Sequence, residues 1–292
     1  MVIQPCIKWS GSKRSQSDQI ISKMPRSIDT YYEPFLGGGS ILIKVLTSNI
    51  QVKNYLVSDL NSDLIGLWNC IKSNPLEVFK HYEYLWNEMY KLRDIDDKKQ
   101  FFLNIRNRLN KHHDPLDFMF IIRTCFNGMP RYNGNGEFNN PLHINRDGIL
   151  PNKLKDILMF WSSKIKCVEF INCSFNKIVP KESDFIYLDP PYANTKGMYF
   201  GNFDLENFYK YVDNLKCKFL LSFDGISKHD QTVNVPFRYV NHFYLVSGNS
   251  SFRRLSSTNK NVVVQESLYS NYNVEENKDN LELWCDLPIN LA

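Results

Sequence analysis

The chain of 292 residues is 43% hydrophobic and 14% aromatic, which supplies an ordinary globular core and excludes a chain that is disordered throughout. Its 35 Lys and Arg residues outnumber its 31 Asp and Glu residues, and the net charge of +4 permits a polyanionic partner without requiring one. At roughly 100–200 residues per domain, the length indicates about two domains.

The beginning of the chain alternates between strands and helices. From Asp29 to Leu46, an aromatic extended run is followed by a glycine cluster and by an apolar helical stretch that Ser40 is predicted to cap. A short apolar strand, Tyr55 to Ser58, ends at Asp59, and helical spacing returns from Asn61 to Ile71. This order is typical of a parallel sheet with helices on both faces.

The next segment differs in composition. From Pro75 to Leu116 the sequence has long polar, aromatic-rich helical patterns with interleaved charges and no comparable strand. Glycines and asparagines then lie between two short extended arms, which predicts a hairpin around Arg131 to Asn139. We therefore predict an inserted, mainly helical domain at residues 72–147, which divides one sheet domain into residues 1–71 and 148–292.

Strand and helix patterns alternate again after the insertion. Helices are predicted from Asn152 to Lys164 and from Leu205 to Leu215. The predicted strands are Cys167–Ile171, Phe185–Leu188, Lys218–Ser222, Tyr239–Val246 and Val262–Val264. The expected fold class is α/β, with a doubly wound Rossmann-like sheet and a helical insertion that carries a β-hairpin.

The cysteines and the apolar runs limit the cellular setting. The seven cysteines are scattered, without Cys-x-x-Cys or Cys/His spacings that bind metals, so we expect reduced thiols and no metal site. Residues 1–14 lack the apolar stretch of a secretory signal. The longest apolar run, Phe118 to Ile122, is too short to span about 30 Å of hydrocarbon, so we expect a soluble cytoplasmic protein without a membrane partner.

The glycine cluster belongs to the segment EPFLGGGS, Glu33 to Ser40. Glycines after a first strand let the backbone approach a ligand closely, and the helix that follows offers free N–H donors, which suits a nucleotide-like cofactor. Asp59 closes the second strand about 20 residues later, where such folds hold ribose hydroxyls. A structural tight turn and a helix cap are the alternative interpretations, and the turn is not a GxGxxG pattern.

The segment Asp189-Pro190-Pro191-Tyr192 follows the apolar strand FIYL. Two prolines stiffen a turn that holds Asp189 and Tyr192 at the carboxyl end of the strand, where open α/β sheets bind ligands. The Asp189 carboxylate and the Pro190 carbonyl can both accept hydrogen bonds from one exocyclic amino group while Tyr192 stacks on a planar base. The lone pair of that nitrogen is then available to an electrophile.

These segments form an ordered set of motif blocks. The blocks are KWSGSK (Lys8–Lys13), EPFLGGGS, SDLNSDLI (Ser58–Ile65), CFNGMPRYNGNGEFNNP (Cys125–Pro141) and DPPY. In this order they resemble the Dam-like DNA adenine-N6 methyltransferases of the alpha arrangement. The resemblance implies an enzyme that flips an adenine out of double-stranded DNA and transfers the methyl group of S-adenosylmethionine to its N6 by in-line displacement, with no metal and no covalent enzyme intermediate.

The resemblance also implies roles for residues at matched positions. Around S-adenosylmethionine it places Trp9, Lys13, Phe35, Gly37, Asp59 and Asp189, and the catalytic residues are Asp189, Pro190 and Tyr192. In the insertion, Arg131 beside Asn133 is expected to pair with guanine, with a surface salt bridge as the alternative. Phe126 and Asn127 are expected to brace the duplex, unless Phe126 is a core residue, and Lys8 is expected to meet a phosphate unless it is only solvated.

Two segments depart from the family pattern. Ser174 stands where an acidic residue often contacts the adenine ring of the cofactor, so that contact is not transferred. After Pro141 the sequence continues with Leu142 and His143 in place of the usual basic residue, so DNA contacts beyond Pro141 are not transferred, although Arg146 is nearby.

The resemblance suggests a recognition site that contains GAT, such as GATC or GATATC, for an orphan enzyme or the partner of a restriction endonuclease. It does not indicate an oligomeric state. The alternatives are methylation of an amino or amide nitrogen in RNA or protein, a non-catalytic DNA-binding relative, and a nicotinamide-cofactor enzyme. The hairpin-bearing insertion favours duplex DNA, Asp189 and Tyr192 weigh against a non-catalytic relative, and the absence of GxGxxG weighs against a nicotinamide enzyme.

Overall fold

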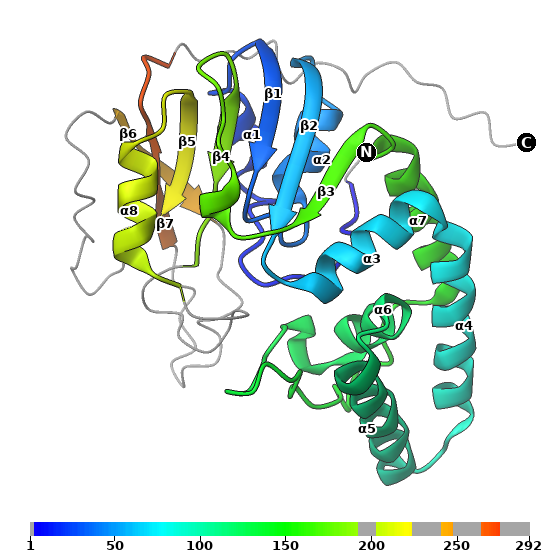
Figure 1. Ribbon diagram of the computed structural model, residues 1–292. Helices are drawn as coiled ribbons and strands as arrows, with labels where there is room; N and C mark the ends of the chain where they lie inside the picture. Colours follow the sequence, from blue (N-terminus) through cyan, green and yellow to red (C-terminus); the bar gives the residue numbers. More distant parts are fainter. Residues whose placement is uncertain (1–2, 192–202, 224–240, 248–263, 275–292) are drawn as a thin grey trace, which may run out of the picture.

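The computed structural model describes residues 3–191, 203–223, 241–247 and 264–274 (Figure 1). The described strands form one seven-stranded sheet in the order β3-β2-β1-β4-β5-β7-β6. Their bounds are Ser27–Glu33 (β1), Gln51–Asp59 (β2), Val168–Asn172 (β3), Phe185–Leu188 (β4), Lys218–Phe223 (β5), Asn241–Ser247 (β6) and Val264–Ser270 (β7). Strands β1 to β5 are parallel, and β7 is antiparallel to both β5 and β6.

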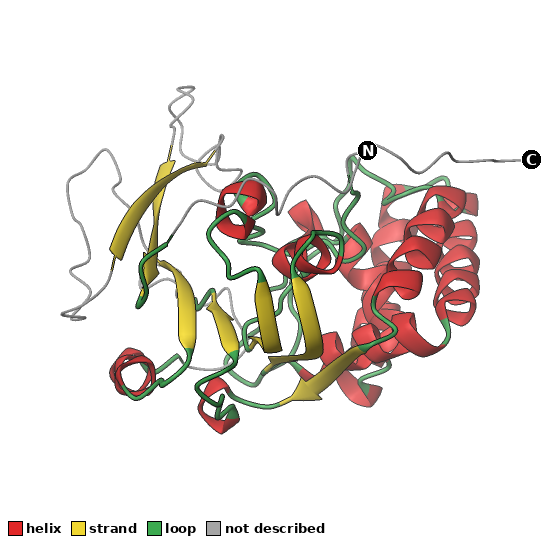
Figure 2. Cartoon of the chain, turned by 90° about the horizontal axis from the view of Figure 1, so that it is seen from above, coloured by secondary structure: helices red, strands yellow, loops and turns green. Residues whose placement is uncertain are grey.

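Helices lie on both sides of the sheet, as the view along its upper edge shows (Figure 2). Their bounds are Ser17–Ile21 (α1), Ser40–Leu46 (α2), Ser62–Ser73 (α3), Pro75–Lys91 (α4), Ile95–His112 (α5), Pro115–Thr124 (α6), Pro151–Lys164 (α7) and Leu205–Asp213 (α8), with short 3-10 helices at Phe126–Gly128 (η1) and Phe175–Lys177 (η2). No described helix is both long and apolar enough to cross a bilayer.

Strand β4 shows that both faces of the sheet are covered, because all four of its side chains are buried. Alternate residues of a strand point to opposite faces, so a strand covered on both faces is apolar throughout. Phe185 and Tyr187 join the larger core with α1 and α2, whereas Ile186 and Leu188 join a smaller core with Phe208 of α8. The predicted doubly wound α/β sheet is therefore confirmed.

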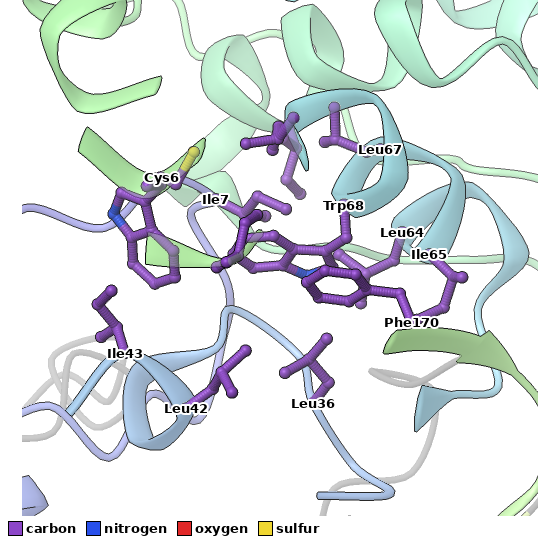
Figure 3. Close-up of a cluster of buried hydrophobic side chains, with 14 of the residues drawn as sticks. Cys6, Ile7, Leu36, Leu42, Ile43, Leu64, Ile65, Leu67, Trp68 and Phe170 are labelled. Carbon is purple, nitrogen blue, oxygen red and sulfur yellow. The ribbon is translucent and has the colours of Figure 1, made fainter. Parts of the chain in front are cut away.

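The larger core continues from the sheet into the insertion. Trp68 of α3 is fully buried, stacks on Phe170 of β3 with 5.7 Å between ring centroids, and packs on Trp161 of α7 at 5.2 Å. Figure 3 shows Trp68 among side chains from the N-terminal segment, the glycine turn and β3. Helix α6 packs on α3 and α4 packs on α7, so the insertion helices, which lie beyond the β3 edge in Figure 1, share this core.

Most predicted elements agree with the structure within a few residues, and two differences matter. The helical part of the insertion, predicted from Pro75 to Leu116, consists of three helices, α4, α5 and α6, and continues to Thr124. Residues 262–263 lie outside the described residues, and the predicted strand Val262–Val264 ends too early, because β7 runs from Val264 to Ser270. Its buried serines, Ser267 and Ser270, break the apolar alternation by which a strand is identified in a sequence.

Candidate active site

The topology sets the position of the site. The chain passes from β1 to β2 and β3 on one side, and then to β4 on the other side of β1. Ligands of open α/β sheets bind at such a reversal, outside the carboxyl ends of the strands. The glycine turn follows β1, Asp59 ends β2, and Asp189 follows β4, so the predicted blocks meet at this edge.

The glycine turn is shaped by two glycines and one indole ring. Gly37 and Gly39 have φ values of +50° and +66°, in a region that residues with a Cβ rarely adopt. A Cβ on Gly37 would also lie 2.8 Å from Cδ1 of Trp9. The indole of Trp9 therefore lies against the backbone of the turn, which joins the first two predicted cofactor blocks.

The predicted cap at Ser40 is wrong. The N-cap of α2 is Gly39 in the left-handed conformation, and Ser40 is the first residue of the helix without a side-chain capping bond. The Ser40 hydroxyl instead accepts a hydrogen bond of 3.2 Å from the backbone N–H of Lys13. The serine thus attaches the N-terminal block to the glycine turn.

Asp59 holds the turn through backbone donors. Its Oδ2 accepts the N–H of Gly37 at 3.0 Å, and its Oδ1 accepts the N–H of Asn61 at 3.0 Å. The alternative role of Asp59 as the cap of α3 is wrong, because the side chain of Asn61 accepts the N–H of Leu64 and caps that helix. Burial raises the pKa of Asp59, and these backbone N–H groups offset part of that rise.

The carboxylate of Asp189 pairs with a lysine from the N-terminal segment. Asp189 follows β4, and its Oδ1 lies 2.7 Å from Nζ of Lys13, whose side chain is 4% exposed. Pro190 is buried beside it. The predicted stacking residue Tyr192 lies outside the described residues.

Two carboxylates share the Lys13 ammonium. Oε2 of Glu266, on β7, lies 3.7 Å from Lys13 Nζ. Burial alone would lower the pKa of Lys13, but Asp189 and Glu266 raise it above its usual range. Burial raises the pKa of Asp189 to about 6, with Lys13 opposing the rise. At neutral pH the lysine is therefore charged and the aspartate is mostly ionised.

Glu33 is a buried acid that the sequence analysis did not single out. Its side chain is 3% exposed, and its Oε2 accepts a hydrogen bond of 2.7 Å from the Tyr31 hydroxyl. Burial raises the pKa of Glu33 to about 8, with a contribution from Asp189. A charged residue before Pro34 gives no sequence signal of burial. Glu266 lies in the part of β7 beyond Val264, which the sequence pattern does not predict as strand.

A cluster of aromatic side chains lies next to the carboxyl end of β1. Phe35 is partly buried and packs on Phe175 and Phe208, with ring centroids 5.5 Å and 5.9 Å away. Phe175 directly follows Ser174, which forms no capping bond. Ser10 directly follows Trp9, and its buried Oγ has no hydrogen-bond partner among the residues that the structure describes.

The predicted hairpin is present as one narrow pairing in the insertion. Tyr132 pairs with Phe138, and the N–H of Asn139 donates to the carbonyl of Arg131 at 2.8 Å. Arg131 is exposed, and its guanidinium donates to the side chain and backbone carbonyl of Asn139 rather than to a carboxylate. The Asn133 Oδ1 accepts backbone N–H groups of the turn, so this side chain shapes the hairpin tip.

The residues expected to brace the duplex lie together. Phe126 is 38% exposed and stacks on His143 with centroids 5.3 Å apart, so its alternative role as a core residue is wrong. Asn127 has a φ of +56°. A Cβ on Gly128 would collide with Cδ of Lys8, which places the Lys8 stem over η1. Burial and the charge of Arg146 lower the pKa of Lys8.

Comparison with known proteins shows the family to which the chain is similar. The model of the D12 class N6 adenine-specific DNA methyltransferases matches residues 9–271. The Type II methyltransferase M.MjaIII of Methanocaldococcus jannaschii is 31% identical over 207 residues, which cover 66% of this chain and 70% of that protein. The DNA adenine methylase of Vibrio cholerae serotype O1 is 32% identical over 193 residues, which cover 64% of both chains. The Type II methyltransferase M.CviBI of Paramecium bursaria Chlorella virus NC1A is 27% identical over 263 residues, 84% of this chain and 94% of that protein.

Proposed function

We propose that this chain, which belongs to the D12 class of N6 adenine-specific DNA methyltransferases, methylates N6 of a flipped-out adenine at a specific site in double-stranded DNA. The observation that carries the proposal is the ion pair between Asp189 and Lys13 at the carboxyl end of β4, beside the glycine turn. It supplies an ionised, fixed acceptor where open α/β sheets bind ligands.

The residues at the edge fit S-adenosylmethionine. Gly37 has no Cβ, so the Trp9 ring packs directly on the backbone of the turn, and the buried Ser10 hydroxyl beside Trp9 is a polar group without a hydrogen-bond partner among the described residues. Asp59 would hold ribose hydroxyls, since an ionised carboxylate offers about four acceptor sites and two hold backbone N–H groups. Phe35 would contact the purine ring. When bound, S-adenosylmethionine supplies an activated methyl group.

Asp189 and Pro190 would orient the target amine. The carboxylate of Asp189 accepts one N–H of the adenine amino group, and the carbonyl of Pro190 accepts the other. With both hydrogens held, the N6 lone pair would be less delocalised into the ring and available to the activated methyl group that S-adenosylmethionine would supply, whose bond to sulfur is the one that breaks. Asp189, whose pKa is about 6, is also placed to accept the proton that N6 loses after the new N–C bond forms. Tyr192 would stack on the base.

The insertion would supply recognition. The exposed guanidinium of Arg131 has the planar fork that pairs with O6 and N7 of guanine, a contact that discriminates by about 1–3 kcal/mol. The exposed ring of Phe126, with Asn127, would occupy the space left by the flipped base, whose unstacking costs a few kcal/mol. Lys8 would meet a phosphate, and Asn133 would hold the hairpin tip that presents Arg131.

We assign a GAT-containing site and a role either as an orphan enzyme or beside a restriction endonuclease. Both rest on the motif resemblance, and two of the relatives carry Type II methyltransferase names. The assignment of DNA recognition to the insertion at residues 72–147, which shares its core with the sheet domain, belongs to the same proposal.

The test is methyl transfer from labelled S-adenosylmethionine to unmethylated genomic DNA, followed by nucleoside analysis and mapping of the methylated positions. We expect N6-methyladenine at one site containing GAT. Asp189→Ala should abolish the product, whereas Asp96→Ala, which removes an exposed carboxylate from α5, should not. Label in RNA or protein with none in DNA would overturn the proposed substrate, and a product that survives Asp189→Ala would overturn the assigned site.

A further inference from the structure

A chain of hydrogen bonds joins the glycine turn to the hairpin of the insertion. Asp59 accepts the N–H of Gly37 through Oδ2 and the N–H of Asn61 through Oδ1, both at 3.0 Å. The side-chain amide of Asn61 then donates to the hydroxyl oxygen of Tyr132 at 2.5 Å. Tyr132 forms the single bridge of the hairpin, with Phe138, and is the immediate neighbour of Arg131.

The local structure fixes this link in one orientation. Asn61 is 1% exposed, and its Oδ1 accepts the N–H of Leu64, so its amide N–H₂ group must face Tyr132. Burial raises the pKa of Tyr132, so the hydroxyl stays neutral, and its oxygen accepts the amide N–H of Asn61. The Tyr132 ring packs edge-on against Phe138, which is 2% exposed, so a shift of the hairpin would move the hydroxyl relative to Asn61.

We propose that Asn61 and Tyr132 are positioning residues through which DNA recognition by the hairpin and cofactor binding at the glycine turn strengthen each other. This inference rests on the proposed function. When DNA bases contact the hairpin residues next to Tyr132, they fix the Tyr132 hydroxyl, which fixes the side chain of Asn61. The backbone N–H of Asn61 in turn fixes the carboxylate of Asp59. A ligand that orders this path once lowers the entropic cost for the second ligand, and the effect must be equal in both directions.

The test is a binding cycle that needs no turnover. S-adenosylhomocysteine, the cofactor after methyl loss, is titrated by calorimetry into the full chain with and without a short duplex that carries the mapped methylation site. We expect the duplex to tighten binding by about fivefold or more, and the same factor to appear when duplex binding is measured by anisotropy with and without S-adenosylhomocysteine. A duplex with a scrambled site should give a smaller factor.

The key variant is Tyr132→Phe, which removes the hydroxyl and keeps the ring. Its affinity for S-adenosylhomocysteine without DNA should stay within about twofold of wild type, while the factor from the duplex falls towards one. Asn61→Ser should give the same loss, because serine can still cap α3 but is too short to reach Tyr132. Tyr82→Phe is the matched control, since its hydroxyl bonds the backbone of Ile149, just after the insertion, and it should keep the wild-type factor.

The outcomes separate this inference from the proposed function. A wild-type chain that binds both ligands with a factor of one, or a folded Tyr132→Phe variant that keeps the full factor, overturns the coupling and leaves the proposed function standing. A wild-type chain that binds neither S-adenosylhomocysteine nor duplex overturns both. Thermal melting of each variant establishes that it is folded. If a variant does not fold, the coupling factor measured for the wild-type chain still tests whether the two ligands strengthen each other's binding.

Discussion

Nζ of Lys13 lies 2.7 Å from Oδ1 of Asp189, so the N-terminal segment supplies the counter-ion of the carboxylate at the end of β4 that we propose to be catalytic. The two residues are far apart in the sequence: Ser40, after β1, holds the backbone N–H of Lys13, and β4, which is parallel to β1, leads into Asp189. The ionisation of Asp189 is therefore set by a residue that also belongs to the proposed cofactor site, and several measurable consequences follow from this pairing and its neighbours.

The rate of methyl transfer should depend on an ionised Asp189. Because the pKa of Asp189 is about 6, single-turnover rates at saturating cofactor should fall about tenfold per pH unit below that value. Lys13→Met removes the cation that lowers this pKa, so the acid limb should move to higher pH by about one unit. Lys44→Met, which removes an exposed lysine paired with Asp18, should leave the limb in place. An unchanged limb in Lys13→Met would refute the assignment of the limb to Asp189.

Glu266→Gln should have the opposite effect on the same carboxylate. The negative charge of Glu266 raises the pKa of Asp189, and its loss also removes a second carboxylate from beside Lys13. The acid limb should therefore move to lower pH by about half a unit or more. Titration of the Asp189 carboxyl by ¹³C NMR in the cofactor-free chain gives an independent measurement. Glu169→Gln, on the exposed side of β3, is the control, and equal shifts in both variants would contradict the prediction.

Glu33 should make the folded chain less stable as the pH rises. Its pKa is raised from the usual 4.5 to about 8, so between these values the folded chain holds a proton that the unfolded chain releases. The free energy of unfolding then falls by about 1.4 kcal/mol per pH unit across that window, and the contribution is complete only below pH 4.5. Urea unfolding of Glu33→Gln should show a shallower decline from pH 5 to pH 8. A slope equal to that of wild type would show that Glu33 is ionised in the folded chain.

Gly37→Ala should damage the cofactor site. The methyl group would lie 2.8 Å from Cδ1 of Trp9, and the backbone keeps a positive φ of 50° that costs about 1–2 kcal/mol for a residue with a Cβ. We expect a loss of affinity for S-adenosylhomocysteine of about tenfold or more, measured by calorimetry. Gly134→Ala, where a Cβ meets nothing within 4 Å, should bind normally. Equal affinities in the two variants would remove the glycine turn from the proposed site.

Asn110→Ala should weaken the discrimination of DNA sequences. The Asn110 side chain donates to the carbonyl of Phe138 and accepts its N–H, so the side-chain amide of Asn110 attaches the hairpin to α5. Each of these bonds contributes about 0.5–1.5 kcal/mol, and a looser hairpin should lower the preference for the mapped site over single-base variants by about tenfold. Competition between duplexes measures this preference. Asn104→Ala, on the exposed surface of the same helix, is expected to behave as wild type.

The family and the alternation of elements were predictable because their signals are local. The motif blocks are short contiguous segments, and the family predicted from them is confirmed. The predicted order of strands and helices around the glycine turn is also confirmed. These features depend on side-chain period and turn chemistry, which neighbouring residues determine.

What could not be predicted depends on tertiary contacts. Ser40 has the sequence of a helix cap, but Gly39 takes that position and the serine bonds to Lys13. Glu266 lies in a strand whose buried serines hide its pattern, and the contact of Asn61 with Tyr132 crosses from the sheet to the insertion. Charge and polarity predict exposure for such residues, and only the folded chain shows which of them are buried with a partner.

The continuity of the core through Trp68 has a consequence for engineering new sequence preferences. A reading module with a core of its own can be exchanged between enzymes as a unit, because its removal leaves the host folded. Here α6 packs on α3, which carries Trp68, and α4 packs on α7, which carries Trp161, so a transplanted set of helices would have to match the shapes of α3 and α7. New preferences are better sought by varying exposed hairpin residues such as Arg131 and Asn135, while Tyr132 and Phe138, which pack on each other, are kept.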